Sequence, residues 1–471
     1  MTRPKLIKSG LVATLVPGAP DVVACDILIR DGKIADIAPH IECEEAEVID
    51  ASDMLVMPGF VDTHRHTWQT AFRGIASDWS LAQYGVALHG MFKPCFSPED
   101  MYLANHLGRI EALNGGITTM LDWAHGILSP DLGDAAAQAL IDAPGRSIFG
   151  YCGNIVAPSS DEDIEPELRR IRRDFFPGDD GLVTMALALR GPQYSSIHTT
   201  IKDVCAGRDL GLRVTVHGGS ASWGKNRPVG QMCEHGLLDE KTTVVHCNSL
   251  ANDELRMMAD CGCTASLSPD AEIQMGFGWP ATGRLLDVGI RPSLSIDDCA
   301  AVCGDMFRTM HSLLLVQRGL DNLTMEEPTD QRGLRLSARD AVEFATIEGA
   351  RACGIDHRIG TIETGKQADL IMLRTDDLSL FPLNHPLGQI VSSGHPGLVD
   401  TVLVSGRIVK RLGRLIGVDL DRLRKETLRS RERILAQAIS KSGGRSGPLR
   451  LDGSWHPETQ GYSSSDMRPE G

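Results

Sequence analysis

Between about residues 58 and 355, short apolar runs that end in polar residues alternate with helical segments. Residues 97–116 are typical of a helix, because Ser97 can cap it, two acidic residues follow in the first turn, and two glycines end it. Continuous apolar strands alternating with helices predict a parallel sheet covered on both faces. Eight such runs predict an α/β protein with a (β/α)8 TIM-like barrel over residues 58–355. The runs are residues 55–66, 116–125, 146–154, 182–193, 211–220, 242–250, 263–272 and 290–298.

The two ends of the chain share a different pattern, of short alternating strands joined by tight turns. Residues 26–39 read as two strands joined by Asp31-Gly32, a strong hairpin signal. Residues 368–377 and 400–413 repeat this style, with Ser405-Gly406 at the second turn. The pattern predicts one small β-sandwich domain composed of residues 1–57 and 356–415.

Beyond this domain the sequence predicts a helix and a tail. Residues 416–440 are amphipathic at helical spacing, so we expect a C-terminal helix. Residues 441–471 are rich in Gly, Ser and Pro, which is typical of a flexible tail. The alternative is a tail that packs on a neighbouring subunit.

Charge and cysteine usage narrow the class of protein. The chain has 471 residues and a formal net charge of −15, which disfavours phosphate backbones and anionic lipid, so we expect no nucleic-acid or membrane partner. No apolar run reaches the ~18 residues of a membrane span, and the N-terminus lacks a signal-peptide pattern. The twelve cysteines are scattered without a C-x-x-C motif, which favours reduced thiols in a cytoplasmic protein.

Four of the predicted strands end in residues that bind metals. The first run ends in His64 and His66, whose i and i+2 spacing puts both side chains on one face. Runs five and six end in His217 and His246, and run eight ends in Asp297. In a barrel these ends converge on one mouth. Imidazoles with a carboxylate suit zinc or ferrous iron, which would lower the pKa of bound water and supply hydroxide near neutral pH.

Each of these residues also has an ordinary structural interpretation. A single strand histidine such as His217 is more often a hydrogen-bonded core residue than a ligand. Asp297 could cap a helix, with Asp298 as its competitor. The joint pattern favours a metal site, because a generic chain rarely places H-x-H, two further histidines and an aspartate at these strand ends.

The chain resembles the amidohydrolase superfamily, in the branch that holds cytosine deaminase, methylthioadenosine deaminase and the triazine hydrolases. The resemblance covers roughly residues 1–415. It rests on five segments: MPGFVDTHRH at 57–66, GGITTMLD at 115–122, VVHC at 244–247, SLSIDD at 293–298 and GTIETGKQADLIML at 360–373.

The resemblance implies a role for each candidate residue. The metal would be held by His64, His66, His217 and Asp297, and Asp297 would also take a proton from the attacking water. His246 would contact that water or the substrate. Binuclear relatives bridge two metals with a carboxylated lysine on strand four, and the fourth run has no lysine. We therefore expect one divalent metal per chain, zinc or alternatively ferrous iron.

The chain departs from the deaminase pattern at strand five. Many deaminases of this branch carry H-x-x-E there, and the glutamate shuttles a proton to the substrate ring. Here the segment is His217-Gly218-Gly219-Ser220, and a serine hydroxyl has no suitable pKa for acid catalysis near pH 7. The substitute that we expect is Glu272, whose alternative is a solvated loop residue; Asp298 and Asp270 are weaker candidates.

Several polar and aromatic residues follow the strand ends and are candidates for substrate binding. Arg190 could hold a substrate carboxylate or carbonyl, or instead pair with a barrel aspartate such as Asp122. The predicted substrate-binding residues are Trp68, Gln69, Arg190 and Gln193. Further aromatic or polar residues of the predicted mouth are Trp79, Trp123, His125, Met275 and Phe277.

These observations predict a mononuclear metal-dependent hydrolase that uses metal-bound hydroxide to cleave a carbon–nitrogen or ring-substituent bond. The favoured reaction is deamination of an aminated heteroaromatic or nucleobase-like small molecule. The alternative is an amide, carbamate, urea or dechlorinating triazine-type hydrolase. More remote alternatives are a lyase and a catalytically inactive barrel that binds a ligand. We also expect a homo-oligomer, a dimer or higher.

Overall fold

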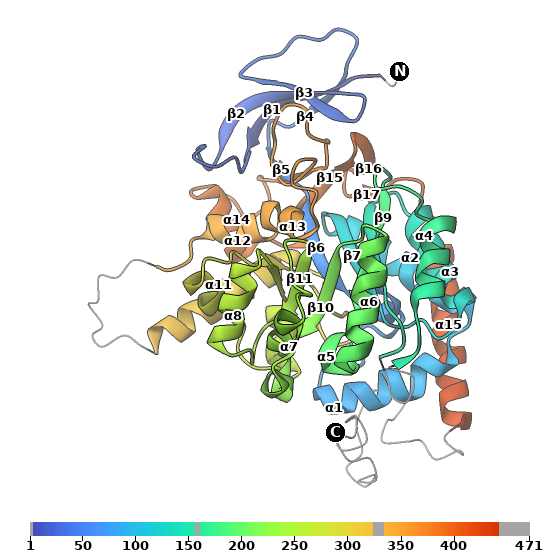
Figure 1. Ribbon diagram of the computed structural model, residues 1–471. Coiled ribbons are helices and arrows are strands. Elements are labelled where there is room, and N and C mark those ends of the chain that lie inside the picture. Colours follow the sequence, from blue (N-terminus) through green and yellow to red (C-terminus); the bar gives the residue numbers. More distant parts are fainter. Residues whose placement is uncertain (1–2, 156–160, 324–333, 442–471) are drawn as a thin grey trace.

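The main feature of the fold is a parallel eight-stranded barrel, seen in a computed structural model that describes residues 3–155, 161–323 and 334–441 (Figure 1). Every adjacent pair within the sheet is parallel and follows chain order. This confirms the predicted (β/α)8 barrel. The strands are β6 (Phe60–Arg65), β7 (Ile117–Ala124), β8 (Arg146–Tyr151), β9 (Val183–Leu189), β10 (Val214–Gly218), β11 (Thr242–His246), β12 (Thr264–Leu267) and β13 (Ser293–Leu294).

The barrel closes between its first and last strands through main-chain bonds. The amide of Asp297 donates to the carbonyl of His64 at 2.9 Å, and the amide of His66 donates to the carbonyl of Asp297 at 2.7 Å. The Thr63 hydroxyl adds a bond to the carbonyl of Leu294 at 3.0 Å. The seam that closes the barrel therefore runs through three residues of the predicted metal site.

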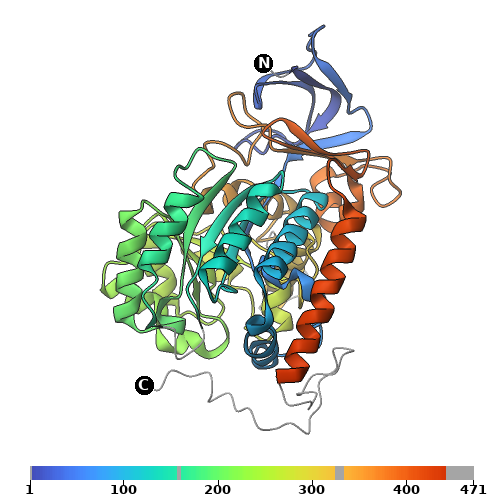
Figure 2. The same ribbon diagram turned by 90° about the vertical axis from the view of Figure 1, so that its right-hand side faces the viewer.

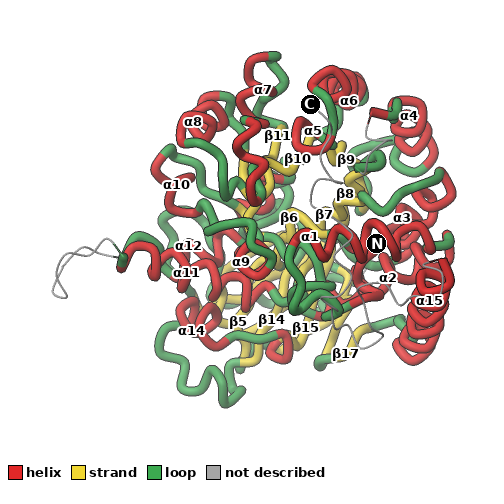
Figure 3. The backbone as a smooth tube through the Cα atoms, turned by 90° about the horizontal axis from the view of Figure 1, so that it is seen from below, coloured by secondary structure: helices red, strands yellow, loops and turns green. Residues whose placement is uncertain are grey.

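Helices surround the barrel, as the view from below shows (Figure 3). The predicted helix at residues 97–116 forms as α2, where Ser97 and Asp100 make a capping box. The helices are α2 (Pro98–Asn114), α3 (Pro130–Asp142), α4 (Glu165–Asp174), α6 (Ile197–Asp209), α7 (Pro228–Glu234), α8 (Asn252–Asp260), α10 (Thr282–Asp287), α11 (Met306–Asn322), α12 (Ala338–Phe344), α13 (Ile347–Ala352) and α14 (Pro386–Ser393).

Short helical turns occur in the segments after several strands, and the two that Figure 1 labels, α1 and α5, lie at the lower end of the barrel. They include α1 after β6 and α5 after β9, so this end is the one at which the strands finish. These elements are η1 (Thr67–Phe72), α1 (Leu81–Tyr84), η2 (Gly85–Phe92), η3 (Lys93–Cys95), α5 (Gly191–Tyr194), η5 (Ala221–Asn226) and α9 (Pro269–Gln274).

A separate nine-stranded sheet forms from both ends of the chain and lies above the barrel in Figure 1. Its two halves join where β5 pairs antiparallel with β14. The predicted hairpin turn is present, with Asp31 and Gly32 both at positive φ. The barrel with a separate β domain from both termini is thereby confirmed. The strands are β1 (Lys5–Val12), β2 (Val23–Arg30), β3 (Lys33–Ala38), β4 (Glu47–Asp50), β5 (Met54–Pro58), β14 (Leu370–Arg374), β15 (Val399–Val404), β16 (Arg407–Arg411) and β17 (Arg414–Leu415).

The C-terminal helix α15 (Leu420–Lys441) runs along the side of the barrel next to α2 (Figure 2). The Ser430 hydroxyl donates to Asp100 at 2.6 Å, and Arg433 pairs with the same carboxylate. Residues 442–471 of the predicted tail lie outside the described residues. No helix in the described part of the chain has the length and apolarity that crossing a membrane requires.

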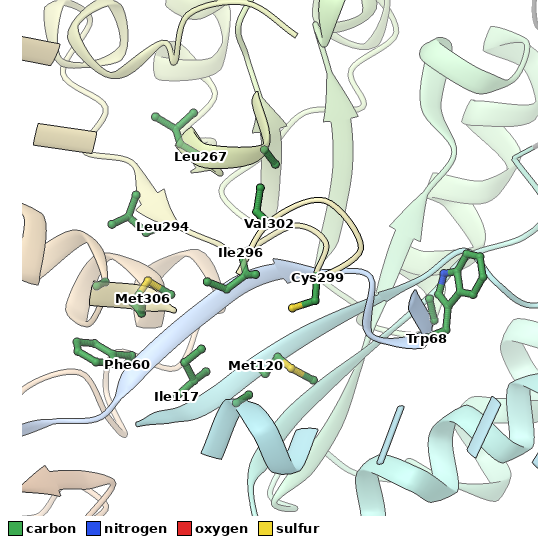
Figure 4. Packing of buried hydrophobic residues seen from close by; sticks show 14 of the residues in the cluster. Phe60, Trp68, Ile117, Met120, Leu267, Leu294, Ile296, Cys299, Val302 and Met306 are labelled. Carbon is green, nitrogen blue, oxygen red and sulfur yellow. The ribbon is translucent and has the colours of Figure 1, made fainter. Parts of the chain in front are cut away.

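The apolar core continues from the barrel into its surrounding helices. Phe60 and Ile117, the first residues of β6 and β7, pack in it with Leu294 (Figure 4). The ring of Phe60 meets Phe307 of α11 edge to face at 5.0 Å between centroids. This packing holds the starts of the strands, which leaves their other ends free to carry polar side chains.

Candidate metal centre and active site

Five side chains from four strands meet at the barrel mouth. His64 and His66 come from the end of β6, His217 from β10 and His246 from the last residue of β11, and Asp297 follows β13. All five are buried, and His64 is fully buried. Because the strands are parallel, their carboxyl ends share one side of the barrel, and the sequence-predicted set is brought together there.

The distances between these side chains define a compact cluster. Asp297 Oδ1 lies 3.4 Å from His64 Nε2 and 3.3 Å from His66 Nε2, and Asp297 Oδ2 lies 4.0 Å from His246 Nε2. Donor atoms of His64, His66 and His217 all lie within 4.8 Å of one another. The same limit holds for His64, His246 and Asp297. Side chains this close can share one small cation.

The chemistry of the donor set fits a divalent metal. Both ring nitrogens of His64 and Nδ1 of His217 are buried without a hydrogen-bond partner among the described residues. Burial, with a smaller contribution from neighbouring His64, lowers the pKa of His66 to about 3. Burial also lowers the pKa of His64 and His217. Neutral imidazoles with unused nitrogens are the form that binds a metal.

A second contact orients one of the candidate ligands. His66 Nδ1 lies 3.0 Å from the carbonyl of Trp123, which leaves Nε2 facing Asp297. Metal-binding histidines commonly donate their other ring nitrogen to a backbone carbonyl or carboxylate in this way, which fixes the tautomer and the ring.

Backbone strain is concentrated at the same strand ends. His246, Cys247 and Asp297 have φ angles of 78°, 62° and 67°, in the left-handed region that non-glycine residues seldom adopt. Such conformations persist only where the surrounding structure enforces them, and they cluster at functional sites. Here they turn the His246 and Asp297 side chains into the mouth.

Asp298 follows Asp297 directly in the chain and is also buried. Its Oδ1 accepts from the amides of Ala300 and Ala301 at 2.6 and 3.1 Å, and its buried Oδ2 has no partner among the described residues. Burial, reinforced by the charge of Asp297, raises the pKa of Asp298 to about 8. The second expected acid candidate, Asp270, instead accepts from Ser312 on α11 at 2.8 Å.

Glu272 lies behind His246 rather than at the wall of the mouth. Its Oε1 lies 3.2 Å from His246 Nδ1 and also accepts from the amide of Ser268 at 2.8 Å. Its Oε2 accepts from Asn248 at 3.1 Å. The carboxylate is fully buried, which excludes the solvated loop alternative. An ionised carboxylate only accepts, so His246 donates through Nδ1 and presents Nε2 toward Asp297.

The cluster opens into a cavity with largely aromatic walls. The ring of His125 stacks on that of His66 at 3.7 Å between centroids, and the ring of Phe277 meets that of His246 at 4.9 Å. The residues that line the cavity are His66, Leu81, Tyr84, His89, His125, Ile155, Tyr194, His217, Ser220, Trp223, His246, Met275, Phe277, Asp297 and Asp298. No lysine or arginine is among these described residues.

Three of the four predicted substrate-binding residues lie one layer behind this wall. Trp68 Nε1 donates to His125 Nδ1 at 2.9 Å. Gln69 and Gln193 each donate to the hydroxyl of a tyrosine that lines the cavity. They follow the strand ends directly, but the chain turns at once into η1 and α5, which carry these side chains into the interior. Trp68, Gln69 and Gln193 therefore contact residues of the cavity wall, but none of the three lines the cavity itself.

Arg190, the fourth predicted substrate-binding residue, forms an internal ion pair and does not line the cavity. Its guanidinium is fully buried and donates two bonds of 2.9 Å to Asp203 on α6. It also donates to the carbonyl of Glu162. Pairing with an aspartate such as Asp122 was one of the two alternatives for Arg190, but Asp122 itself instead accepts from the amide of Thr67.

Sequence reasoning missed six residues of the cavity wall: Leu81, Tyr84, His89, Ile155, Tyr194 and Trp223. Tyr194 lies one position after Gln193, and Trp223 lies three positions after Ser220. The strand-end pattern, which had reached Gln193 and Ser220, could have been extended to them. Tyr84 and His89 lie about twenty residues after β6, where no strand end marks them. Of the other expected mouth residues, His125, Met275 and Phe277 line the cavity, and Trp123 packs against His217 at 4.2 Å.

Comparison with known proteins agrees with this architecture. Residues 55–409 match the model of the amidohydrolase family. A 5'-deoxyadenosine deaminase of Methanothermobacter thermautotrophicus is 31% identical over 83% of this chain and 90% of its own length. An adenosine deaminase structure from Xanthomonas campestris with bound zinc superposes with a TM-score of 0.79 at 24% identity, over 91% of this chain and 98% of that one. The structure of an atrazine chlorohydrolase from Arthrobacter aurescens TC1, in complex with zinc, superposes with a TM-score of 0.80 at 21% identity. The match covers 90% of this chain and 99% of that one.

Proposed function

Because this chain belongs to the amidohydrolase family, and so is a hydrolase of carbon–nitrogen bonds, we propose that it deaminates an aminated heteroaromatic small molecule at the barrel mouth. The observation that carries the proposal is the buried cluster of histidines and Asp297, with ring nitrogens left unpartnered among the described residues. Such a cluster is costly to bury unless something binds those nitrogens.

We propose that His64, His66, His217 and Asp297 hold one divalent metal ion, zinc in the first place. When bound, the ion supplies the Lewis acidity that makes water a nucleophile near neutral pH. Two relatives of the same fold were solved with zinc, which supports the choice of metal for this chain. Elemental analysis of the purified protein would identify the ion and its stoichiometry.

The protein's own side chains then have separate tasks. The Asp297 carboxylate, between His64, His66 and His246, takes the proton of the attacking water. His246, held at Nδ1 by Glu272, presents Nε2 to the water or the substrate. The aromatic wall excludes bulk water and packs against a planar ring.

Ammonia release tests the proposed reaction. We expect the zinc-loaded protein to release ammonia from at least one compound in a panel of aminated purines, pyrimidines, pterins and triazines, with 5'-deoxyadenosine and methylthioadenosine included. The two nucleosides are included because curated relatives are named as their deaminases. Enzyme-coupled ammonia detection would follow the reaction, with apoprotein as the control. Silence across the whole panel would reject deamination.

A second candidate function rests on Ser220. This serine lines the cavity at the position where the resemblance implies a proton-shuttling glutamate. Without that acid, a leaving group that departs as an anion needs less help, which favours hydrolysis of a ring substituent. Chloride or alkoxide release from substituted triazines would support this reaction, and acid release from amides or carbamates would support the amide alternative.

Glu272 gives a prediction that separates two roles. If Glu272 only orients His246, Glu272→Gln should lower kcat about 10-fold, because the amide oxygen can still accept from Nδ1 and from the Ser268 amide. If Glu272 is the general acid, kcat should fall by ~10²-fold or more. Steady-state kinetics measures the difference. Glu272→Ala is the matched variant. It removes the acceptor of His246 Nδ1, so its kcat should be lower than that of Glu272→Gln if Glu272 orients His246.

Two properties of the whole chain remain proposals. All twelve cysteines are free thiols, which supports a reducing, cytoplasmic compartment. We also propose a homo-oligomer of two or more subunits, which light scattering would measure directly.

A further inference from the structure

Two tyrosines face the cavity from different parts of the barrel. Tyr84 ends α1, which follows β6, and Tyr194 ends α5, which follows β9. These strands are the first and fourth of eight, so the two side chains approach the cavity from well-separated directions. The ring of Tyr194 also meets Trp223 at 5.6 Å and His217 at 5.7 Å between centroids, which holds it beside the metal cluster.

Each tyrosine hydroxyl is held by a glutamine in the layer behind it. Gln69 Nε2 donates to the Tyr84 hydroxyl at 2.5 Å, and Gln193 Nε2 donates to the Tyr194 hydroxyl at 3.1 Å. No other hydrogen bond of either hydroxyl occurs among the described residues. A phenol has one hydrogen to donate and, with an ordinary pKa near 10, keeps it at neutral pH. Because each oxygen already accepts from an amide, its hydrogen is free to point into the cavity.

We propose that the hydroxyls of Tyr84 and Tyr194 are the two donors that recognise the substrate, each binding an acceptor atom of its ring. The proposal rests on the function proposed above and names its substrate more narrowly. The substrate is a planar, uncharged heteroaromatic with acceptor atoms, ring nitrogens or an exocyclic oxygen, on two sides of the attacked carbon. No lysine or arginine among the described cavity residues would pair with an anionic group.

The two tyrosine donors also explain how the site can work with Ser220 at the position where the resemblance implies a proton-shuttling glutamate. Hydroxyl donors on ring nitrogens draw electron density from the carbon between them, so the carbon becomes more electrophilic without transfer of a proton. The two hydroxyls position and polarise the ring as neutral donors. Their hydrogen bonds are strong because water is excluded from the site. Gln69 and Gln193 are positioning residues in this scheme, because they act through the tyrosines and do not reach the cavity.

Isosteric variants test the proposal by kinetics. For an amine that the wild type deaminates, Tyr84→Phe and Tyr194→Phe should each lower kcat/KM about 10-fold or more, with metal content and Tm unchanged. The matched control is Tyr102→Phe, which removes a tyrosine hydroxyl bonded to Asp142 on the outside of the barrel and should act as the wild type. Wild-type kcat/KM in both cavity variants would overturn the proposal.

A binding assay keeps the test independent of turnover. Calorimetry would compare 2-aminopyrimidine, whose amino-bearing carbon lies between two ring nitrogens, with its isomer 4-aminopyrimidine, whose amino-bearing carbon has a ring nitrogen on one side only. We expect the wild type to bind 2-aminopyrimidine about 10-fold more tightly, and expect at least one tyrosine variant to lose this preference. That result would support the two donors even if no compound releases ammonia, so the two proposals can fail separately. Equal affinities in the wild type, or no binding of either compound, would overturn the inference.

Discussion

Replacing Asp297 with asparagine is expected to lower kcat/KM by ~10⁴-fold or more while leaving the fold intact. The side chain lies within 3.4 Å of His64 and His66 and faces His246, so an amide there could neither take a proton nor balance the charge of a cation. The closing seam of the barrel uses the main chain of Asp297, which the substitution retains. Asparagine also tolerates the left-handed conformation that this position has.

Steady-state kinetics and a thermal melt, run together, measure this prediction. The matched control is Asp305→Asn, because Asp305 caps α11 away from the cavity and asparagine caps a helix equally well. This control should keep wild-type activity and Tm. If Asp297→Asn loses activity and Tm in parallel, Asp297 has a structural role; if it retains turnover, the assignment of the base is wrong.

Replacing His66 with alanine should abolish metal retention and turnover together. His66 directs Nε2 toward Asp297 and is aligned by the Trp123 carbonyl, so the substitution removes one of the proposed ligands. We expect the metal content to fall from about one ion per chain to below ~0.1 after dialysis, because a four-ligand site would lose a full ligand.

Mass spectrometry of the dialysed protein gives the metal content, and the ammonia assay gives turnover. His106→Ala is the matched control, since His106 binds the carbonyl of Ala139 on the outer helices and has no contact with the cluster. That variant should retain both metal and activity. Full activity in His66→Ala would reject the ligand set, and bound metal without activity would move His66 from ligand to substrate contact.

The meeting of the histidines with Asp297 could be predicted from the sequence because one rule places all these residues. Parallel strands of a barrel finish at the same end, so residues that end apolar runs must meet, however far apart they are in the chain. His64, His217 and Asp297 come from three such runs, and the structure brings them within contact distance. The sheet formed from both termini followed from hairpin signals of the same local kind.

The second layer could not be predicted in this way. Gln69 and Gln193 each lie four residues past the end of a strand, where a sequence pattern does not say whether the next turn points inward or outward. Local helical turns carry both behind the tyrosines that they support. The sequence predicts Glu272 at the mouth, but the structure places it behind His246, because its position depends on the packing of α9, which no periodicity encodes.

The sheet that joins the two ends of the chain has a consequence for synthesis on the ribosome. Strand β5 pairs with β14, which emerges roughly 300 residues later, so at 5–20 residues per second the N-terminal strands wait on the order of 15–60 s for their partner. During that interval β5 carries an unpaired edge, the kind of surface that recruits other nascent chains. A newly made chain is therefore most exposed to aggregation before residue 374 has left the exit tunnel, and a chaperone that binds extended apolar segments would act on this intermediate.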